Sequence, residues 1–322
     1  ATVRTGVMND GTFVARECLS YVDTGGYTDN GVRVTERISD RIVGPYMFNN
    51  VRVKSYGIYT NTTPAGSYRS IGGPQASWAC ESQTDIIAEA LGIDPIELRL
   101  KNLAKKGDQV RRGKRPLEGD LAPKLQMVLD KFGWDNYVRE DPSPTVKRGI
   151  GFACNVTNSG ASPTSTSLVR FHADGSATVY IGTTELGQGS RSVMAQIAAE
   201  ELRIPLSSIK VIGSDTDAVP YDRSTGSSRS TTLMGLAVHD AAVDVREQLM
   251  ELAAKHFETF ADQIEAADGQ ASFKGESLTF GALVREMFGG SGGELMGRGY
   301  VTQNHSSGRL TEDPVFWEVS IG

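Results

Sequence analysis

Three loops rich in glycine and serine contain the residues of this chain that are best suited to chemistry. The first, residues 182–189, follows an alternating strand pattern and precedes an apolar-periodic helix that begins at Ser190. A turn of this kind directs backbone N–H groups and the positive end of a helix dipole to one point, which suits a phosphate or another anion. Gln188 lies between two glycines, where few side chains would block a ligand. The sequence therefore predicts that an anionic group binds here.

Two further loops have the same character, and each also precedes a predicted helix. They are residues 64–75, Pro-Ala-Gly-Ser-Tyr-Arg-Ser-Ile-Gly-Gly-Pro-Gln, and residues 224–232, Ser-Thr-Gly-Ser-Ser-Arg-Ser-Thr-Thr. For any one loop alone, local turn geometry is the simpler explanation. Three such loops together suit a large cofactor with several oxygen atoms better than they suit one small anion.

The turn signals and apolar patterns around these loops predict the elements that position them. Together they predict an α+β fold of two mixed α/β lobes with hairpins and helices. Asn9-Asp10-Gly11 is a hairpin signal, because Asn and Gly tolerate positive φ. Gly92 is expected to end one helix, and Asp94 is expected to cap the next, with Pro95 in its first turn. The predicted strands are residues 3–8, 12–21, 51–60, 150–156, 168–172, 178–181 and 210–212, and the predicted helices include 75–91, 125–132, 190–202, 233–257 and 280–288.

The composition along the chain divides it into three parts. Residues 1–106 are expected to form part of a first lobe, residues 107–146 a charged, proline-containing connection, and residues 147–322 part of a second lobe. Residues 87–98 resemble residues 197–208, either because of an internal duplication or because two α/β units end their helices in the same way. The chain starts and ends within strand-like sequence, so we expect it to be a piece of a longer subunit.

Charge and cysteine usage exclude several classes of function. The net charge is −6, 22% of residues are charged, and neither sign forms a long run, which argues against nucleic acid or an anionic membrane surface as partner. No apolar window is long enough for a membrane span, and no signal-peptide pattern is present. The three cysteines and four histidines lack ligand spacing, so an iron–sulfur or zinc site made by this chain alone is excluded. Isolated thiols fit a reducing compartment, and we expect a cytoplasmic protein.

The three loops resemble motifs in the large subunit of the molybdenum hydroxylases, the xanthine dehydrogenase/aldehyde oxidase family. The family's Gly-Thr-Thr-Glu-Met-Gly-Gln-Gly loop corresponds to residues 182–189, with Leu186 in place of Met. Its Arg-Gly-Phe-Gly-x-Pro-Gln loop corresponds to residues 69–75, and its Gly-Ala-Ser-Arg-Ser-Thr segment corresponds to residues 226–231. Because the order and spacing also match, the resemblance extends over nearly the whole chain.

The resemblance implies a molybdenum–pterin cofactor, possibly as the cytosine dinucleotide, to which the protein need donate no Cys or His ligand. The protein must supply hydrogen-bond donors around oxo, sulfido and phosphate oxygens, which glycine-rich loops can do. FAD and 2Fe–2S groups would be held only by partner chains. The implied partners are the remainder of the large subunit, an iron–sulfur subunit, a flavin subunit and a small-molecule substrate.

The resemblance also implies roles for single residues. Gln188 would donate its amide to an oxygen on the metal or the pterin, and Arg69 and Ser227 would present backbone N–H groups near molybdenum without ligating it. Tyr68 and Ile71 would face the substrate. The implied cofactor-binding residues are Arg69, Ser70, Gly187, Gln188, Gly189, Thr225, Gly226, Ser227, Ser228, Arg229 and Ser230, and the implied substrate residues are Arg37, Tyr68, Ile71 and Asn158. Arg37 is equally well explained as an ordinary surface arginine near Glu36 and Asp40.

Departures from the family pattern limit what the chain is expected to do alone. No catalytic residue is assigned within it, because the general-base glutamate is expected beyond Gly322. Glu294 follows two glycines, but a flexible glycine run is not expected to hold a carboxylate in place, so it is rejected as that base. Ser70 stands where carbon monoxide oxidisers have Cys, and aliphatic Ile71 stands where purine oxidisers have an aromatic residue. An aldehyde, a non-purine N-heterocycle or an aromatic acid derivative is therefore the expected substrate.

Two other interpretations are open. Residues 178–215 imitate a dinucleotide-binding fingerprint, with a strand, Gly187-x-Gly189 and a helix, although Ser192 replaces the third glycine. Alternatively, the chain is an assembly segment without chemistry of its own. The first interpretation, an oxidoreductase that hydroxylates carbon with oxygen from water and is incomplete in this chain, is the one that all three loops favour.

Overall fold

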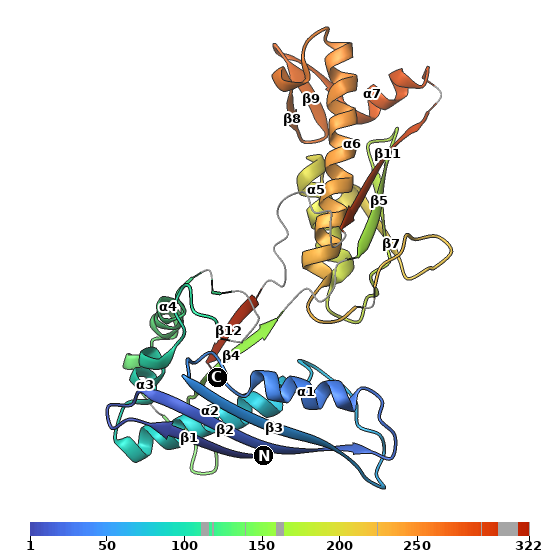
Figure 1. Cartoon of the computed structure of the whole chain (residues 1–322). Helices are drawn as coiled ribbons and strands as arrows, with labels where there is room; N and C mark the ends of the chain where they lie inside the picture. Colours follow the sequence, from blue (N-terminus) through green and yellow to red (C-terminus); the bar gives the residue numbers. More distant parts are fainter. Residues whose placement is uncertain are drawn as a thin grey trace. The chain divides into compact units, whose positions relative to one another are not determined.

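The computed structural model describes residues 1–110, 116–117, 119–138, 140–158, 164–223, 225–290, 292–301 and 315–321. The chain forms two compact units, one of Ala1–Thr157 with Val315–Gly322 and the other of Asn158–Pro314. Each unit combines helices with sheets that contain antiparallel pairs, so the α+β prediction is confirmed (Figure 1).

Unit 1 is built on a three-stranded sheet in the order β1-β2-β3. The predicted hairpin is confirmed, since β1 runs antiparallel to β2, whereas β3 lies parallel to β2 on its other side. Helices α1 and α2 cover one face of this sheet (Figure 1). Alternate residues of β2, such as Arg16, Cys18 and Ser20, are buried, as the period of a strand requires. The bounds are β1 Thr2–Val7, β2 Phe13–Gly25, α1 Gly31–Arg41, β3 Asn50–Tyr59 and α2 Gly73–Leu91.

The predicted boundary between two consecutive helices is confirmed in detail. Gly92 adopts the left-handed conformation (φ +65°) after α2, where its N–H donates to the carbonyls of Ala88 and Glu89. The Asp94 carboxylate then accepts hydrogen bonds from the N–H groups of Ile96 (2.8 Å) and Glu97 (3.0 Å), and α3 (Pro95–Asn102) begins with proline. Local capping chemistry explains why sequence alone located this boundary.

Residues 107–157 lie in unit 1, so the boundary between the units comes later in the chain than the predicted connection. Leu125 and Leu129 of α4 (Ala122–Phe132) are buried in the same core cluster as Tyr46 and Leu98. Strand β4 (Phe152–Asn158) pairs with β12 (Val315–Ile321). The assignment of 1–106 and 147–322 to two cofactor-binding lobes stays a prediction.

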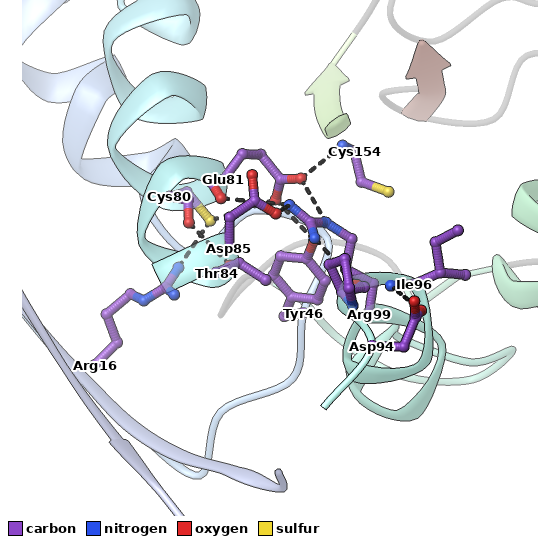
Figure 2. A network of polar contacts seen from close by, with 11 residues as sticks. Arg16, Tyr46, Cys80, Glu81, Thr84, Asp85, Asp94, Ile96, Arg99 and Cys154 are labelled. Carbon is purple, nitrogen blue, oxygen red and sulfur yellow. Dashed lines mark hydrogen bonds and ion pairs between the residues drawn. The ribbon is translucent and has the colours of Figure 1, made fainter. Parts of the chain in front are cut away.

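A buried polar network lies in the core of unit 1, centred on Glu81 and Arg99 (Figure 2). The Glu81 carboxylate accepts hydrogen bonds from Arg99 Nε (3.0 Å), the Tyr46 hydroxyl (2.7 Å) and the Cys154 N–H (2.8 Å). Arg99 Nη2 also pairs with Asp85 Oδ1 at 2.8 Å. These contacts join the consecutive helices α2 and α3 to β4, which comes much later in the chain, so the network fixes how three elements of the unit meet.

Unit 2 contains a four-stranded sheet in the order β11-β5-β6-β7, with α5 and α6 side by side against it. The predicted strands at residues 168–172 and 178–181 lie in β5 and β6, which form an antiparallel pair, and α5 connects β6 to the parallel strand β7. A π-helical turn, Ser230–Met234, leads into α6. A small sheet, β10-β9-β8, and α7 complete the unit. The bounds are β5 Ser165–His172, β6 Ala177–Ile181, α5 Ser190–Leu202, β7 Ile209–Gly213, α6 Gly235–His256, β8 Glu265–Ala267, β9 Gln270–Phe273, β10 Glu276–Thr279, α7 Phe280–Met287 and β11 Glu294–Val301; short 3₁₀ turns are Trp134–Asn136, Leu206–Ser208 and Ala261–Gln263.

Two glycines of β11 let the backbone of α6 pack directly on the sheet. A Cβ added at Gly299 would overlap the carbonyl oxygen of Ala237 and lie 2.6 Å from the N atom of Ala241. A Cβ added at Gly297 would likewise overlap the Ala241 carbonyl oxygen. The small side chains of α6 and the glycines of β11 therefore bring helix and strand together. This close packing fixes the N-terminal end of α6 against the sheet, and with it the end of the loop that precedes α6.

No helix within the described ranges contains an apolar stretch that could cross a bilayer. The three cysteines are free thiols and all are buried. Burial raises the pKa of the Cys80 thiol to about 11 and that of Cys154 to about 12, so both stay protonated near neutral pH.

Candidate functional site

The glycine loop between β6 and α5 is organised by its own carboxylate. Glu185 Oε1 accepts hydrogen bonds from the N–H groups of Gly187 (2.8 Å) and Gly189 (3.0 Å). Glu185 Oε2 accepts from Ser190 Oγ (3.1 Å) and the N–H of Arg191 (3.2 Å). The expectation that these N–H groups are free for an external anion is therefore wrong, because an internal anion already accepts their hydrogen bonds.

The Gln188 side chain forms two hydrogen bonds with the backbone of the same loop. Its Nε2 donates to the Thr184 carbonyl oxygen at 2.9 Å, and its Oε1 accepts from the Leu186 N–H. The side chain nevertheless stays exposed, and an amide nitrogen carries two hydrogens, of which the Thr184 contact uses one. The contact of this amide with a metal or pterin oxygen remains a prediction.

A buried ion pair ties the loop at 222–230 to the glycine loop. Arg229 Nη1 donates to Asp222 Oδ1 at 2.7 Å, and both side chains are almost completely buried, with 2% and 0% exposed. Asp222 also accepts hydrogen bonds from Thr183 Oγ1 (2.6 Å) and Ser165 Oγ (2.7 Å). Arg229 Nη2 donates to the Thr164 carbonyl oxygen at 2.8 Å. One carboxylate and one guanidinium thus join β5, the end of β6 and the loop before α6.

Arg229 consequently has a positioning role in the structure. The resemblance implied that it belongs to the cofactor-binding residues, but its guanidinium is buried and directed into the protein. Sequence reasoning missed its partner Asp222, because nothing in the spacing of seven residues indicates a buried pair. Gly182 allows the pair to form, since a Cβ at this position would lie 2.6 Å from the Asp222 Cβ.

The two loops of unit 2 also contact each other and leave an open side. Thr225 Oγ1 accepts from the Thr184 N–H (3.0 Å) and lies 3.2 Å from the Thr184 carbonyl oxygen. A Cβ added at Gly187, Gly189 or Gly226 would meet no atom within 4 Å. These glycines therefore border space that a bulky ligand could enter, and this geometry fits a large oxygen-rich cofactor.

Ser227 and Ser228 follow Gly226 in an unusual backbone conformation. Both have φ of +53°, in the left-handed region that non-glycine residues seldom adopt. Two such residues in succession turn the chain sharply into the π-helical turn at Ser230. Strained backbone of this kind is concentrated at functional sites, where the surrounding structure enforces it. Here the buried Arg229 supplies that enforcement from the next position.

The third loop, residues 64–75, belongs to unit 1 and is held by α1. Arg41 Nη1 donates to the Ser70 carbonyl oxygen, to Ser70 Oγ at 2.9 Å and to the Ile71 carbonyl oxygen at 3.4 Å. Ser70 and Ile71 both have positive φ, +60° and +28°. Arg69 and Tyr68 remain exposed, with the guanidinium 5.8 Å from the ring centroid. Arg41 is a loop-positioning residue that no sequence motif indicated.

Two further residues, Arg37 and Asn158, were predicted to contact the substrate. Arg37 lies on α1 and forms a partly buried ion pair with Asp40 at 3.0 Å, one of the two acidic neighbours expected for an ordinary surface arginine. Its role toward substrate stays a prediction. Asn158 is the last residue of β4, and its side chain lies outside the described part of the structure.

Glu294 is held firmly, contrary to the reason given for rejecting it as a base. It begins β11, and its carboxylate accepts a hydrogen bond from Arg170 Nε at 2.9 Å and lies 3.7 Å from His172 Nδ1. The register of β11 against β5 brings these groups together. Its position at the far end of these strands from the two loops makes it a structural residue of the sheet.

We expect the Glu185 cap to be sensitive only to strong acid. Hydrogen bonds from the Gly189, Arg191 and Gly187 N–H groups lower the pKa of this carboxyl from 4.5 to about 2. Because the folded-state pKa is depressed, the cap stabilises the loop fully above pH 4.5 and loses this effect as the pH falls toward about 2. An NMR titration of the carboxyl carbon should give a midpoint near 2. A midpoint at the ordinary value would contradict the cap.

No cluster of three or more His, Cys, Asp or Glu side chains suited to a metal ion occurs in the described parts of the chain. The donors that the loops offer are exposed serines, backbone groups and one amide, which are suited to oxygen atoms of a ligand.

Two protein-family models match the chain, both described as a molybdopterin cofactor-binding domain, over residues 1–103 and 127–321. The putative xanthine dehydrogenase molybdenum-binding subunit of Escherichia coli (strain K12) is 32% identical over 257 residues, which is 77% of this chain and 34% of that protein. The aldehyde oxidoreductase of Megalodesulfovibrio gigas is 28% identical over 338 residues, which is 99% of this chain and 36% of that protein. The chain thus spans about a third of the length of these relatives.

A solved structure shows the same fold. The crystal structure of a Cu,Mo carbon monoxide dehydrogenase matches 99% of this chain and 44% of that chain, with a TM-score of 0.79 and 21% sequence identity. At this identity the likeness concerns the fold alone. The family models, which match residues of both structural units, confirm the family predicted from the three loops. This chain belongs to the molybdopterin cofactor-binding family, whose members include the molybdenum-binding subunits of xanthine dehydrogenases and aldehyde oxidoreductases.

Proposed function

We propose that this chain holds the molybdenum–pterin cofactor of an oxidoreductase that hydroxylates an aldehyde or an N-heterocycle with oxygen from water. The observation that carries the proposal is the pair of joined loops in unit 2. Asp222 and Arg229 clamp them together, and three glycines border open space beside exposed donors. Family models of cofactor-binding domains that match both units support it further.

In this proposal the loops bind and orient the cofactor through hydrogen bonds. Gln188 donates its second amide hydrogen, and Ser227 and Ser228 offer hydroxyl and backbone donors. Arg69 and Ser227 would offer backbone N–H groups near the metal, and Ser70 would be a further residue that contacts the cofactor. The bound molybdenum–pterin supplies the two-electron redox chemistry, and we propose the cytosine dinucleotide form because several small-residue loops can accommodate an extended anion.

The substrate would contact the exposed face of the unit 1 loop. Tyr68, which is 90% exposed, offers an aromatic surface, and Ile71 offers an aliphatic one. Such a pair favours an aldehyde, a non-purine heterocycle or an aromatic acid derivative over a purine stacked between two rings. Arg37 would orient the substrate, and Asn158 would contribute a polar contact.

The remaining parts of the enzyme would come from other polypeptide segments. We propose that the rest of the large subunit supplies the general-base glutamate. Electrons would leave through an iron–sulfur subunit with 2Fe–2S groups and a flavin subunit with FAD. Three buried free thiols suit a reducing compartment, and we propose the cytoplasm.

Elemental analysis of the complete large subunit tests this function. The subunit, purified from a host that makes the molybdenum cofactor, is expected to contain about one molybdenum atom, with pterin released on denaturation. The same preparation from a host unable to make the cofactor is the control and should contain neither. Full-length protein from the competent host without molybdenum would refute the proposal.

The dinucleotide-binding interpretation is not favoured. That fingerprint needs a helix N-terminus that is open to a pyrophosphate. The Glu185 carboxylate accepts hydrogen bonds from the N–H groups of Gly187, Gly189 and Arg191 next to the start of α5, and a second anion there would meet like charge.

A further inference from the structure

A side chain of the preceding loop accepts hydrogen bonds at the start of α5. The two carboxylate oxygens of Glu185 each accept two hydrogen bonds, three from backbone N–H groups and one from the Ser190 hydroxyl. The N-terminus of a 13-residue helix carries a partial positive charge, which a carboxylate offsets. The sequence alone assigned this position to an external anion, and the structure assigns it to Glu185.

We propose that Glu185 is a built-in anion that keeps the phosphate of the cofactor away from α5 and fixes the loop that presents Gln188. This inference rests on the proposed function for the identity of the ligand. The geometry of the cap does not depend on it. Glu185 acts as a positioning residue, because its contacts are with the loop itself.

The chemistry of the cap requires a charged group with two equivalent acceptors. Glutamine offers one acceptor oxygen, and its NH₂ group would face N–H donors at the other position. Aspartate keeps both acceptors but is one methylene shorter than the span from Gly187 to Arg191 requires. A Glu185→Gln change therefore loses about half of the hydrogen bonds without changing side-chain size.

The loop that Glu185 holds is coupled to the rest of the site. Gln188 bonds back to Thr184, and Thr184 bonds to Thr225 of the second loop. Loosening of the α5 turn would thus reach the donors near Gly226 through two contacts. In this proposal a phosphate bound beside these loops is held by Gly226, Ser227 and Ser228, of which Gly226 and Ser228 are exposed, and not by the N–H groups that Glu185 occupies.

Residue-resolved amide hydrogen exchange of the full chain tests the cap directly. In the wild-type protein the N–H groups of Gly187, Gly189 and Arg191 are expected to be protected. In Glu185→Gln their exchange should be about tenfold faster, as for loss of a helix cap. Glu200→Gln is the matched control, because Glu200 is an exposed glutamate of the same helix, and it should leave the three amides unchanged.

Amide exchange in the presence of inorganic phosphate tests whether Glu185 occupies a position that would otherwise bind an anion. A purely structural role of Glu185 predicts no effect of phosphate. In Glu185→Ala the vacated helix start should bind phosphate and slow exchange of the three amides again, while the wild-type protein should not respond. If the variants do not fold, the exchange measurement on wild-type protein with phosphate still tests the inference. Phosphate that slows the same amides in wild-type protein overturns the inference, as does a Glu185→Ala protein that ignores phosphate.

Cofactor content separates this inference from the proposed function. In the complete subunit from a cofactor-competent host, Glu185→Gln should retain several-fold less molybdenum than wild type or Glu200→Gln. Wild-type protein without molybdenum would refute the function and leave the exchange result standing. Unchanged molybdenum in Glu185→Gln, with amides as protected as in wild type, would refute the role of Glu185 and leave the function standing.

Discussion

Replacement of Asp222 by asparagine is expected to destabilise unit 2 by about 3–5 kcal/mol, because it leaves the Arg229 guanidinium buried without a counter-charge. The two side chains are 0% and 2% exposed, so water cannot compensate. Thr183 and Ser165 donate to different oxygens of Asp222, and asparagine keeps only one acceptor oxygen, so one of the two hydroxyls would also lose its acceptor. Hydrogen exchange of β5 and β6 in urea should show the loss.

The chain provides its own controls for this measurement. Asp217→Asn changes an exposed carboxylate in the same segment and should cost less than about 1 kcal/mol. Trp78, Trp134 and Trp317 all belong to unit 1, so their fluorescence should report an unchanged transition. The double variant Asp222→Leu with Arg229→Met removes both charges and should recover much of the stability. Equal effects of Asp222→Asn and Asp217→Asn would show that the pair does not hold the loops.

Replacement of Glu81 by glutamine is the second large change that we expect, and it acts on unit 1. Arg99 is fully buried and would keep only the partly exposed Asp85 as a charged partner. Tyr46 and the Cys154 N–H would lose a charged acceptor as well. We expect a loss of about 3 kcal/mol, seen as a lower urea midpoint by tryptophan fluorescence.

Asp85→Asn is the matched control on the same helix. Its carboxylate contacts the same guanidinium but is 58% exposed, so its loss should cost about 1 kcal/mol or less. If the two substitutions lower the midpoint equally, the ion pair with Glu81 is not the contact that organises the core of unit 1. Exchange in β5 and β6 should be unaffected by both.

Features that depend on neighbours in sequence were predicted well. The β1–β2 hairpin, the left-handed Gly92 and the Asp94 cap all follow from turn and capping chemistry within a few residues. The three loops were located by the same kind of local signal, and their motifs led to the correct family. The strand β11 was not predicted, because it is formed by pairing with β5, which lies far earlier in the chain. The helix α1 was overlooked although its buried residues, Gly31, Val34, Thr35 and Ile38, recur at helical spacing.

The roles of charged residues could not be predicted from local sequence in this way. A carboxylate or guanidinium is defined by the group that it meets, and that partner often lies far away in the chain. Arg41 holds a loop 29 residues away, and Glu294 pairs with Arg170 across 124 residues. No spacing rule reaches over such separations. Even Glu185, two residues from Gly187, was overlooked, since a side chain that folds back onto its own loop competes with any ligand for the same N–H groups.

The sequence by itself determined the fold class, the hairpins, the helix boundaries and the family, since each depends on backbone preferences and motifs that act over a few residues. Only the tertiary structure decided which donors at the loops are free, that Arg229 is a buried clamp rather than an exposed contact, and that residues 107–157 belong to unit 1. The physical reason is that burial and charge pairing are properties of three-dimensional proximity, which the order of residues along a chain does not specify.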